Sequence, residues 1–398
     1  MQSVCVGMWA HIGARHESLR QAGISHFVEH LLFKGTKRFN PRQISAAVEG
    51  VGGYINAFTS EDATCYYAKA CAPHLDRLLD VLVDIYQNSV FAEDEIERER
   101  QVIREEILMY RDQPSQRVLE LLGSVMWPDH PLGRPITGTA ETVTRITRHE
   151  ILEFTGRHYN TNASTIVVAG PFSHEEVLQR LKHLKMRFPG GRRARHLPVR
   201  PVARRAPVFE KHDVEQAHVA IGFEGFGRHD SRRYALRLLS VVMGENMSSR
   251  LFQEMRERRG FCYSVGSAVS LFDEIGMLSI SLGLEPGNLN KATRVLFREL
   301  ARLRDKPIGK AELNRAKDYT IGQLLMSLES TTNQMIWAGE SLTGYGALVE
   351  PSVMPARIAA VTAESIREVA NLLLCGERMG VATVGDLEKL PDFAAMIA

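Results

Sequence analysis

Apolar and polar positions along this chain show two periodicities, the alternation of strands and the spacing of helices. Together they predict a mixture of strands and helices. Residues 3–10 (SVCVGMWA) have the alternation and the β-branched side chains of a strand. Residues 54–70 are rich in Tyr, Phe, Ile and Thr, which favour strands. Residues 75–88 and 93–111 carry apolar side chains at helical spacing, so we expect two amphipathic helices there.

Three further segments fit the same mixture. Residues 42–53 (RQISAAVEGVGG) predict a helix that the glycine pair at its end closes. Residues 164–171 (STIVVAGP) predict a short buried strand, and Ser173 is placed to cap the helix that follows. The first half of the chain therefore mixes strands and helices.

The second half repeats the order of the first. Residues 217–244 predict a strand, a Gly-containing turn, a charged stretch and a helix, in the order found in residues 4–35. An internal duplication of whole domains would explain this likeness. We expect two related domains, residues 1–186 and 208–398.

The segment between these domains is rich in Pro, Gly and Arg. Residues 187–207 have no apolar periodicity, which is typical of a linker. Their basic character would also suit a patch for nucleic acid or anionic lipid, but no aromatic residues are interleaved with the arginines. We favour the linker.

Composition and charge narrow the classes of partner. A net charge of +2 over 398 residues is too small to indicate nucleic acid or a membrane surface as the ligand. No apolar run approaches the length of a membrane span, and residues 1–14 have the pattern of neither a signal peptide nor a transit segment. The five scattered cysteines fit reduced thiols. We expect a cytoplasmic protein.

One short segment carries candidate metal chemistry. Within GISHFVEHLLFKGT, His26, Glu29 and His30 fall at positions i, i+3 and i+4, which share one face of a helix. Two imidazole nitrogens one turn apart can bind one zinc ion, and the carboxylate then lies beside the open position of the metal. The corresponding helix of the second half has Tyr234 and Leu238 and no such cluster.

A catalytic zinc ion needs a third protein ligand, and the helix over residues 93–111 offers candidates. Glu99 and Glu106 share the apolar stripe of that helix, whereas Glu105 is rotated away toward solvent. A carboxylate on a buried stripe needs a cation, which is either a metal or a buried Arg or Lys. The two histidines favour a metal. We expect Glu106 to be the third ligand and Glu99 to orient a ligand imidazole.

This set of residues suits amide hydrolysis. Zinc lowers the pKa of a bound water to about 7. Glu29 is placed to take the proton of that water and to pass it to the leaving amine. The sequence therefore predicts a zinc-dependent peptidase with one zinc ion per chain.

Four sequence blocks resemble one known family. HFVEH with LLFKGT, then GGYINAFTSEDATCYY and IERERQVIREEI, are similar to the pitrilysin-type inverzincin metallopeptidases, in particular the branch of the mitochondrial processing peptidase β subunit and its bacterial relatives. The interval from His30 to Glu106 agrees with that family. In the second half, MSSRLFQEMRERRGFCYSV is similar to the C-terminal domain signature, so the resemblance covers nearly the whole chain.

The resemblance implies a fold and further site residues. It implies an α+β fold in which two homologous half-domains, each with helices packed on a mostly antiparallel sheet, form half of a clamshell. Asn56, Ala57 and Phe58 match the segment that pairs with substrate backbone as an added strand. Arg256 and Tyr263 match a pair that approaches the site from the second domain. The resemblance implies that Tyr263 donates to the oxyanion and that Arg256 orients the substrate or Tyr263 itself.

The family also suggests partners and alternatives. Its subunits pair, so we expect a homodimer or a heterodimer with a related chain that acts on extended peptides. Two other functions are a catalytically silent assembly subunit and a zinc-containing peptide-binding protein without turnover. The intact set of His26, Glu29, His30 and Glu106 favours the enzyme.

Two departures from the family pattern bear on structure. Members usually begin with a further strand containing an NGL turn before the segment that starts here at Ser3, so we expect either that the first sheet lacks an edge strand or that the chain has been truncated. Glu245 and Asn246 stand in a loop that is usually richer in Gly, which affects the expected flexibility of that loop. Neither departure touches a proposed zinc ligand.

Overall fold

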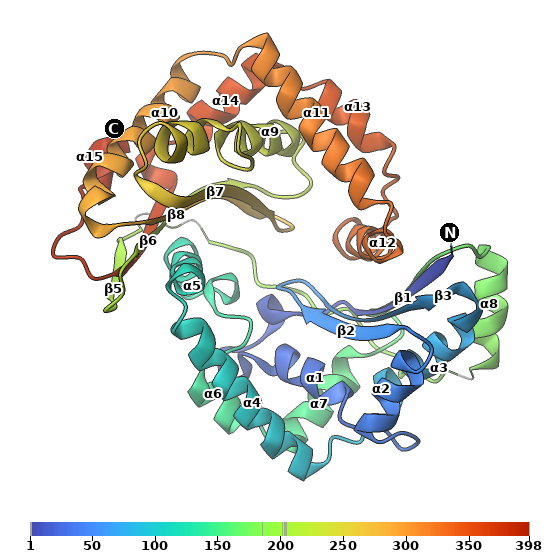
Figure 1. Cartoon of the computed structure of the whole chain (residues 1–398). Coiled ribbons are helices and arrows are strands. Elements are labelled where there is room, and N and C mark those ends of the chain that lie inside the picture. Colours follow the sequence, from blue (N-terminus) through green and yellow to red (C-terminus); the bar gives the residue numbers. More distant parts are fainter. Residues whose placement is uncertain (1, 185, 201, 203–204, 398) are drawn as a thin grey trace. The chain divides into compact units, whose positions relative to one another are not determined.

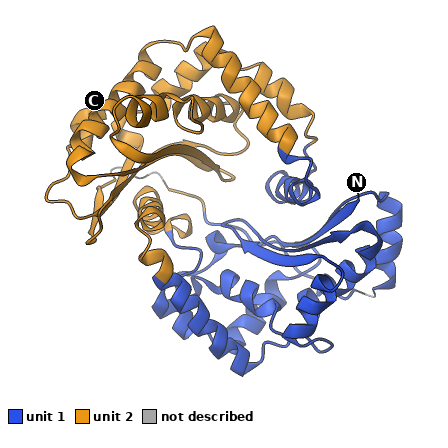
Figure 2. Cartoon of the chain, in the orientation of Figure 1, with its two compact units in different colours: residues 1–108, 134–197, 327–349 blue, residues 109–133, 198–326, 350–398 orange. Residues whose placement is uncertain are grey.

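The computed structural model describes residues 2–184, 186–200, 202 and 205–397. The chain forms two compact units, shown in different colours in Figure 2. Among the described residues, no helix combines the length and the apolar character that crossing a membrane requires. Each unit joins helices to its own sheet, so the predicted α+β class is confirmed.

Unit 1 is built on a four-stranded antiparallel sheet. Its strands are β1 (Ser3–Ala10), β2 (Tyr54–Thr59), β3 (Thr64–Cys71) and β4 (Ser164–Ala169), in the order β2-β3-β1-β4. Strand β2 is therefore an edge strand, paired on one side with β3 in a register that sets Ala57 opposite Tyr66. The strands expected over residues 3–10 and 54–70 are confirmed, the latter as a hairpin.

Helices cover both faces of this sheet, as Figure 1 shows. Alternate residues of β1 point to opposite faces: Val4, Val6 and Met8 pack in a core with α1 and α3, while Cys5 and Trp9 pack against α12. The helices of unit 1 are α1 (Ile24–Leu32), α2 (Pro41–Glu49), α3 (Leu75–Asn88), α4 (Glu93–Arg111), α6 (Ala140–Arg145), α7 (Arg148–His158), α8 (His174–His183) and α12 (Thr331–Tyr345).

The predicted helices agree closely with these bounds. Helices α3 and α4 span the expected residues, and Ser173 caps α8 by accepting a hydrogen bond from the backbone N–H of Glu176. The helix expected over residues 42–53 is shorter. It begins at Pro41 and ends at Glu49, because the chain turns after Gly50 and Gly52 takes a positive φ of 73°.

Unit 2 is built on a five-stranded sheet in the order β5-β9-β6-β8-β7. Its strands are β5 (Val208–Lys211), β6 (Ala217–Phe226), β7 (Cys262–Leu271), β8 (Ile275–Leu284) and β9 (Met379–Gly385), and all neighbours are antiparallel except β5 and β9. Its helices are α5 (Pro114–Met126), α9 (Arg233–Met243), α10 (Leu289–Asp305), α11 (Lys310–Ser327), α13 (Val353–Ala359), α14 (Ala363–Leu373) and α15 (Phe393–Ile397).

The two sheets share a topology. Read in chain order, β1, β2, β3 and β4 occupy the same relative places as β6, β7, β8 and β9. This shared order agrees with an internal duplication. Strand β5 has no counterpart among the described strands of unit 1.

Two segments make the units discontinuous along the chain, which differs from the domain boundaries expected from the sequence. Residues 109–133, which contain the end of α4 and all of α5, belong to unit 2, and residues 327–349, which contain α12, belong to unit 1. Packing explains both placements. Val118, Leu122 and Met126 of α5 join a core with β6 and β9, and Met335 of α12 packs against Trp9.

Glycine allows α12 to approach the sheet closely. A Cβ on Gly339 of α12 would lie 2.0 Å from the Trp9 ring, and one on Gly7 of β1 would lie 2.3 Å from the Met335 sulfur. Real Cβ atoms do not approach other atoms so closely, so a larger residue at either position would force Trp9 or Met335 to move. Helix α12 therefore packs directly on β1.

The segment expected to be a linker forms neither helix nor strand among its described residues. Its first part is fastened to unit 1, since the Asn162 amide donates to the Gly191 carbonyl at 2.6 Å. Its last part is fastened to unit 2, since the buried Arg205 guanidinium donates to the Met126 carbonyl at 3.3 Å and pairs with Glu224.

Candidate metal centre

Helix α1 carries the HxxEH residues on one side and a core stripe on the other. Its apolar side chains are buried in unit 1, and they are Ile24, Phe27, Val28, Leu31 and Leu32. The helical period then leaves His26, Glu29 and His30 together away from that stripe. Burial of the stripe fixes the rotation of α1 and so the direction of the three polar side chains.

The first turn of α1 is held by a carboxylate from outside the helix. The N-cap residue Gly23, which directly precedes α1, has a φ of 94° and no side chain to cap the helix. Buried Glu17 takes this role, accepting hydrogen bonds from the backbone N–H groups of Gly23 at 2.7 Å and Ser25 at 2.8 Å. A negative charge at a helix N-terminus is favourable, but burial raises the pKa of Glu17 to about 7.

Helix α4 is fixed against α1 by a buried arginine. The Arg100 guanidinium lies 5.4 Å from the centre of the Phe27 ring of α1 and donates to the Ile146 carbonyl at 2.9 Å. Ile96 and Ile103 of α4 are buried in the core that contains α1. This stripe of α4 therefore faces the core, as the sequence predicted, and Glu105 is exposed.

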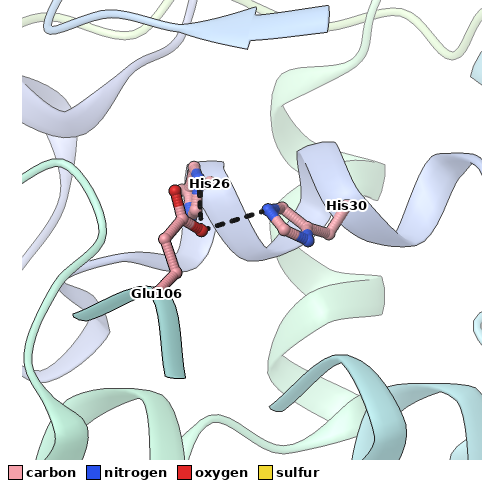
Figure 3. Close-up of side chains that lie close together, drawn as sticks. All are labelled: His26, His30 and Glu106. Carbon is pink, nitrogen blue, oxygen red and sulfur yellow. Dashed lines mark ion pairs between the residues drawn. The ribbon is translucent and has the colours of Figure 1, made fainter. Parts of the chain in front are cut away.

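The side chains of His26, His30 and Glu106 converge (Figure 3). The Nε2 atoms of both histidines lie 3.6 Å from the same Glu106 carboxylate oxygen. One possible ligand atom from each of the three residues lies within 4.8 Å of the others. Two imidazole nitrogens and one carboxylate are a donor set that catalytic zinc takes, so these residues fit the metal predicted from the sequence.

The charges of the two histidines differ. Burial lowers the pKa of His26 to about 4, and the neighbouring His30 acts in the same direction, so His26 is neutral at pH 7 as a ligand must be. Burial alone would lower the pKa of His30, but Glu106 and Glu99 outweigh it and raise that pKa to about 9. The two carboxylates thus favour a positive charge at the place where His26, His30 and Glu106 meet.

Glu99 orients His30. Its buried carboxylate accepts a hydrogen bond from His30 Nδ1 at 3.0 Å, which directs the Nε2 atom of His30 toward Glu106. The other Glu99 oxygen pairs with the Lys34 ammonium at 2.7 Å. Burial would raise the pKa of Glu99, but His30 and Lys34 together lower it, so Glu99 stays ionised.

Glu29 lies beside the cluster and is held by the sheet. Its Oε2 atom accepts a hydrogen bond of 2.5 Å from the hydroxyl of Thr59, the last residue of β2. Burial raises the pKa of Glu29 above its ordinary value, while the hydrogen bond from Thr59 opposes that shift. A half-buried carboxylate with a raised pKa is suited to accept and return a proton.

The residues expected to bind substrate lie on the edge strand. Asn56, Ala57 and Phe58 are consecutive residues of β2. The backbone N–H of Ala57 donates to the side-chain oxygen of Asn56 at 2.8 Å in an exposed contact. Phe58 instead packs in the core on the α12 face, with its ring 5.5 Å from that of Trp9.

Arg256 and Tyr263 belong to unit 2 and interact with each other. The Arg256 guanidinium lies 5.4 Å from the centre of the Tyr263 ring and 4.9 Å from that of Phe252. Tyr263 is 72% exposed. Arg256 lies in a π-helical segment, Phe252–Glu257, a local distortion that is frequent at functional sites.

Sequence comparisons place these residues in a known family. Residues 1–140 match the family model described as insulinase (peptidase family M16), and residues 145–319 match the model described as the peptidase M16 inactive domain. A curated protein of Streptomyces coelicolor is 35% identical over 98% of this chain and 86% of its own length. The chain belongs to peptidase family M16.

The M16 relatives are named for zinc-dependent proteolysis. The S. coelicolor protein is named an uncharacterized zinc protease, as is a protein of Bacillus subtilis that is 37% identical over 86% of this chain and 83% of its own length. His26, Glu29, His30 and Glu106 all lie in the part that matches the insulinase model.

Solved structures show the same M16 fold. The structure of a protease from Helicobacter pylori matches with a TM-score of 0.92 and 21% identity, covering 97% of this chain and 94% of that one. A chain of complex III2 from Candida albicans matches with a TM-score of 0.86 and 17% identity, covering 100% of this chain and 94% of that one.

Three residues around the cluster were not among those predicted from the sequence. Lys34 contacts Glu99 and Thr59 contacts Glu29. Glu17 instead accepts from the backbone at the start of α1. Lys34 gave a weak signal, because it follows His30 at i+4, although α1 ends before it at Leu32. Glu17 and Thr59 gave none.

Proposed function

We propose that this chain is a zinc-dependent endopeptidase that hydrolyses extended or unstructured peptides. The observation that carries the proposal is the convergence of His26 Nε2 and His30 Nε2 on one Glu106 oxygen, with the Glu29 carboxylate alongside. His26, His30 and Glu106 would hold one zinc ion. When bound, zinc lowers the pKa of water and polarises a carbonyl group.

The residues of the chain supply the proton transfers. The Glu29 carboxylate takes a proton from the attacking water, and the protonated acid then gives it to the leaving amine when the peptide bond breaks. Glu99 keeps His30 oriented by accepting from its Nδ1 atom, and Lys34 keeps Glu99 in place.

The edge strand β2 is the proposed peptide-binding element. An edge strand presents backbone donors and acceptors that an extended peptide can pair with. In this proposal a substrate strand lies against Asn56, Ala57 and Phe58 and replaces the local contact between the Ala57 N–H and the Asn56 side chain. Because that recognition is made through backbone atoms, it selects extended peptides over folded ones.

Arg256 and Tyr263 are proposed to complete the site from unit 2. The exposed phenol of Tyr263 would donate a hydrogen bond to the oxyanion of the tetrahedral intermediate. Arg256 contacts the Tyr263 ring and would hold it or the substrate in position. We also propose a cytoplasmic setting, since all five cysteines are free.

Metal removal tests the proposal directly. We expect the zinc-loaded chain to cleave a quenched fluorogenic peptide without stable structure, to lose this activity when 1,10-phenanthroline removes the metal, and to regain it with one equivalent of Zn²⁺. If the zinc-loaded protein cleaves no member of a diverse peptide library, the endopeptidase proposal is wrong. The alternative functions would then be a catalytically silent assembly subunit or a peptide-binding protein.

Self-association is a separate proposal. We propose a homodimer, because both the HxxEH residues and the Arg256 and Tyr263 pair are present on one chain. Light scattering at micromolar concentration should give about twice the monomer mass of 44.6 kDa. A monomer mass would contradict the homodimer and leave pairing with a related chain.

A further inference from the structure

The contact between Glu29 and Thr59 joins the proposed base to the proposed peptide-binding strand. Thr59 ends β2, and its hydroxyl lies 2.5 Å from Glu29 Oε2. An ionised carboxylate has no proton to give, so the hydroxyl is the donor. This length is typical of a strong hydrogen bond from a hydroxyl to a carboxylate.

The geometry of β2 fixes the Thr59 hydroxyl in this position. Side chains alternate along a strand, so Thr59 lies on the same face as Ile55 and Ala57, both of which pack against the core that contains α1. The backbone of Thr59 pairs with Thr64 of β3. The β-branched side chain has few rotamers. The donor is therefore held from both the backbone and the side chain.

The hydrogen bond makes the two Glu29 oxygens different. Oε2 accepts from Thr59, which leaves Oε1 as the less engaged oxygen for the proton of the attacking water. Without the bond, the carboxylate can rotate about its last torsion, which is broad for glutamate. A misplacement of about 1 Å at a catalytic group can lower the rate about 100-fold.

We propose that Thr59 is a positioning residue for the base Glu29, an inference that rests on the proposed peptidase function. Because Thr59 belongs to the strand that would pair with the peptide, one element sets both the register of the scissile bond and the direction of the base. In this proposal Thr59 acts through Glu29 and not through any of the three metal ligands.

The test compares Thr59→Val, which removes the hydroxyl and keeps the shape, with Thr59→Ser, which keeps the hydroxyl. We expect Thr59→Val to lower kcat about 10- to 100-fold with KM and zinc content unchanged, and Thr59→Ser to stay within about threefold of the wild type. In the Glu29→Gln background, Thr59→Val should cause no further loss, because the two residues act as one unit.

A matched control separates positioning from stability. Thr165→Val removes a hydroxyl from β4 of the same sheet, where Thr165 contacts His11 at 2.7 Å, and should leave kcat unchanged. If the wild type cleaves peptide and Thr59→Val keeps its kcat, the positioning role is wrong while the peptidase function stands. Equal losses of kcat in Thr59→Val and Thr59→Ser would also refute the positioning role. If the wild type itself does not cleave, both the positioning role and the peptidase function are wrong.

Discussion

Replacing Glu29 by Gln should lower kcat for peptide cleavage by about 100- to 10,000-fold, the range that a general base contributes, and leave one zinc ion bound per chain. The amide has the size of the carboxylate and can still accept the hydrogen bond from Thr59. It cannot take a proton from water. Rates measured with a fluorogenic peptide, with zinc content determined on the same samples, test this expectation.

The control for this variant is another Glu-to-Gln change in unit 1. Glu49 is exposed at the end of α2, and Glu49→Gln should cleave like the wild type. A Glu29→Gln variant with a kcat within about threefold of the wild type would exclude Glu29 as the base. If the variant lost zinc together with activity, Glu29 would instead contribute to metal binding.

The part of the site that lies on one helix was predictable from the sequence. His26, Glu29 and His30 are related by helical geometry alone, so their spacing fixes their common face before any tertiary contact forms. The same applies to α4, whose apolar stripe separated Glu99 and Glu106 from the exposed Glu105. Local periodicity therefore predicted which carboxylates turn inward.

Periodicity could not say what meets each inward carboxylate. The sequence left two partners open, a metal or a buried cation. In the structure Glu99 pairs with the Lys34 ammonium at 2.7 Å, and Glu106 faces the two histidines at 3.6 Å. Glu99 thus has the basic side chain of the second alternative, whereas a metal at Glu106 stays a prediction. Deciding between them needs the rotation of α1 against α4, which Arg100 and the shared core set.

Contacts between separate elements were beyond the sequence pattern. Thr59 and Glu29 lie thirty positions apart and meet only because β2 packs on α1. The exchange of α5 and α12 between the compact units has the same origin, since amphipathic helices do not show in their sequence which sheet they will cover. Roles of Asn56, Ala57, Phe58, Arg256 and Tyr263 remain predictions for the same reason.

Replacing Glu106 by Gln should weaken zinc binding by more than about 100-fold, beyond the 10- to 100-fold that changes to outer partners of a ligand typically cost. The amide oxygen is a poorer donor than the carboxylate, and the variant loses the negative charge that both histidines face at 3.6 Å. Competition against a chromophoric chelator measures the affinity. Peptide cleavage should be lost at zinc concentrations that saturate the wild type.

The neighbouring Glu105 provides the matched control for this prediction. It lies on the same helix, one residue earlier, but points to solvent. Glu105→Gln removes the same charge from nearly the same place, so a general electrostatic effect on the metal would appear in both variants. We expect Glu105→Gln to bind zinc and cleave peptide like the wild type. Equal zinc affinities of the two variants would exclude Glu106 as a ligand, because only direct coordination distinguishes two carboxylates so close along one helix.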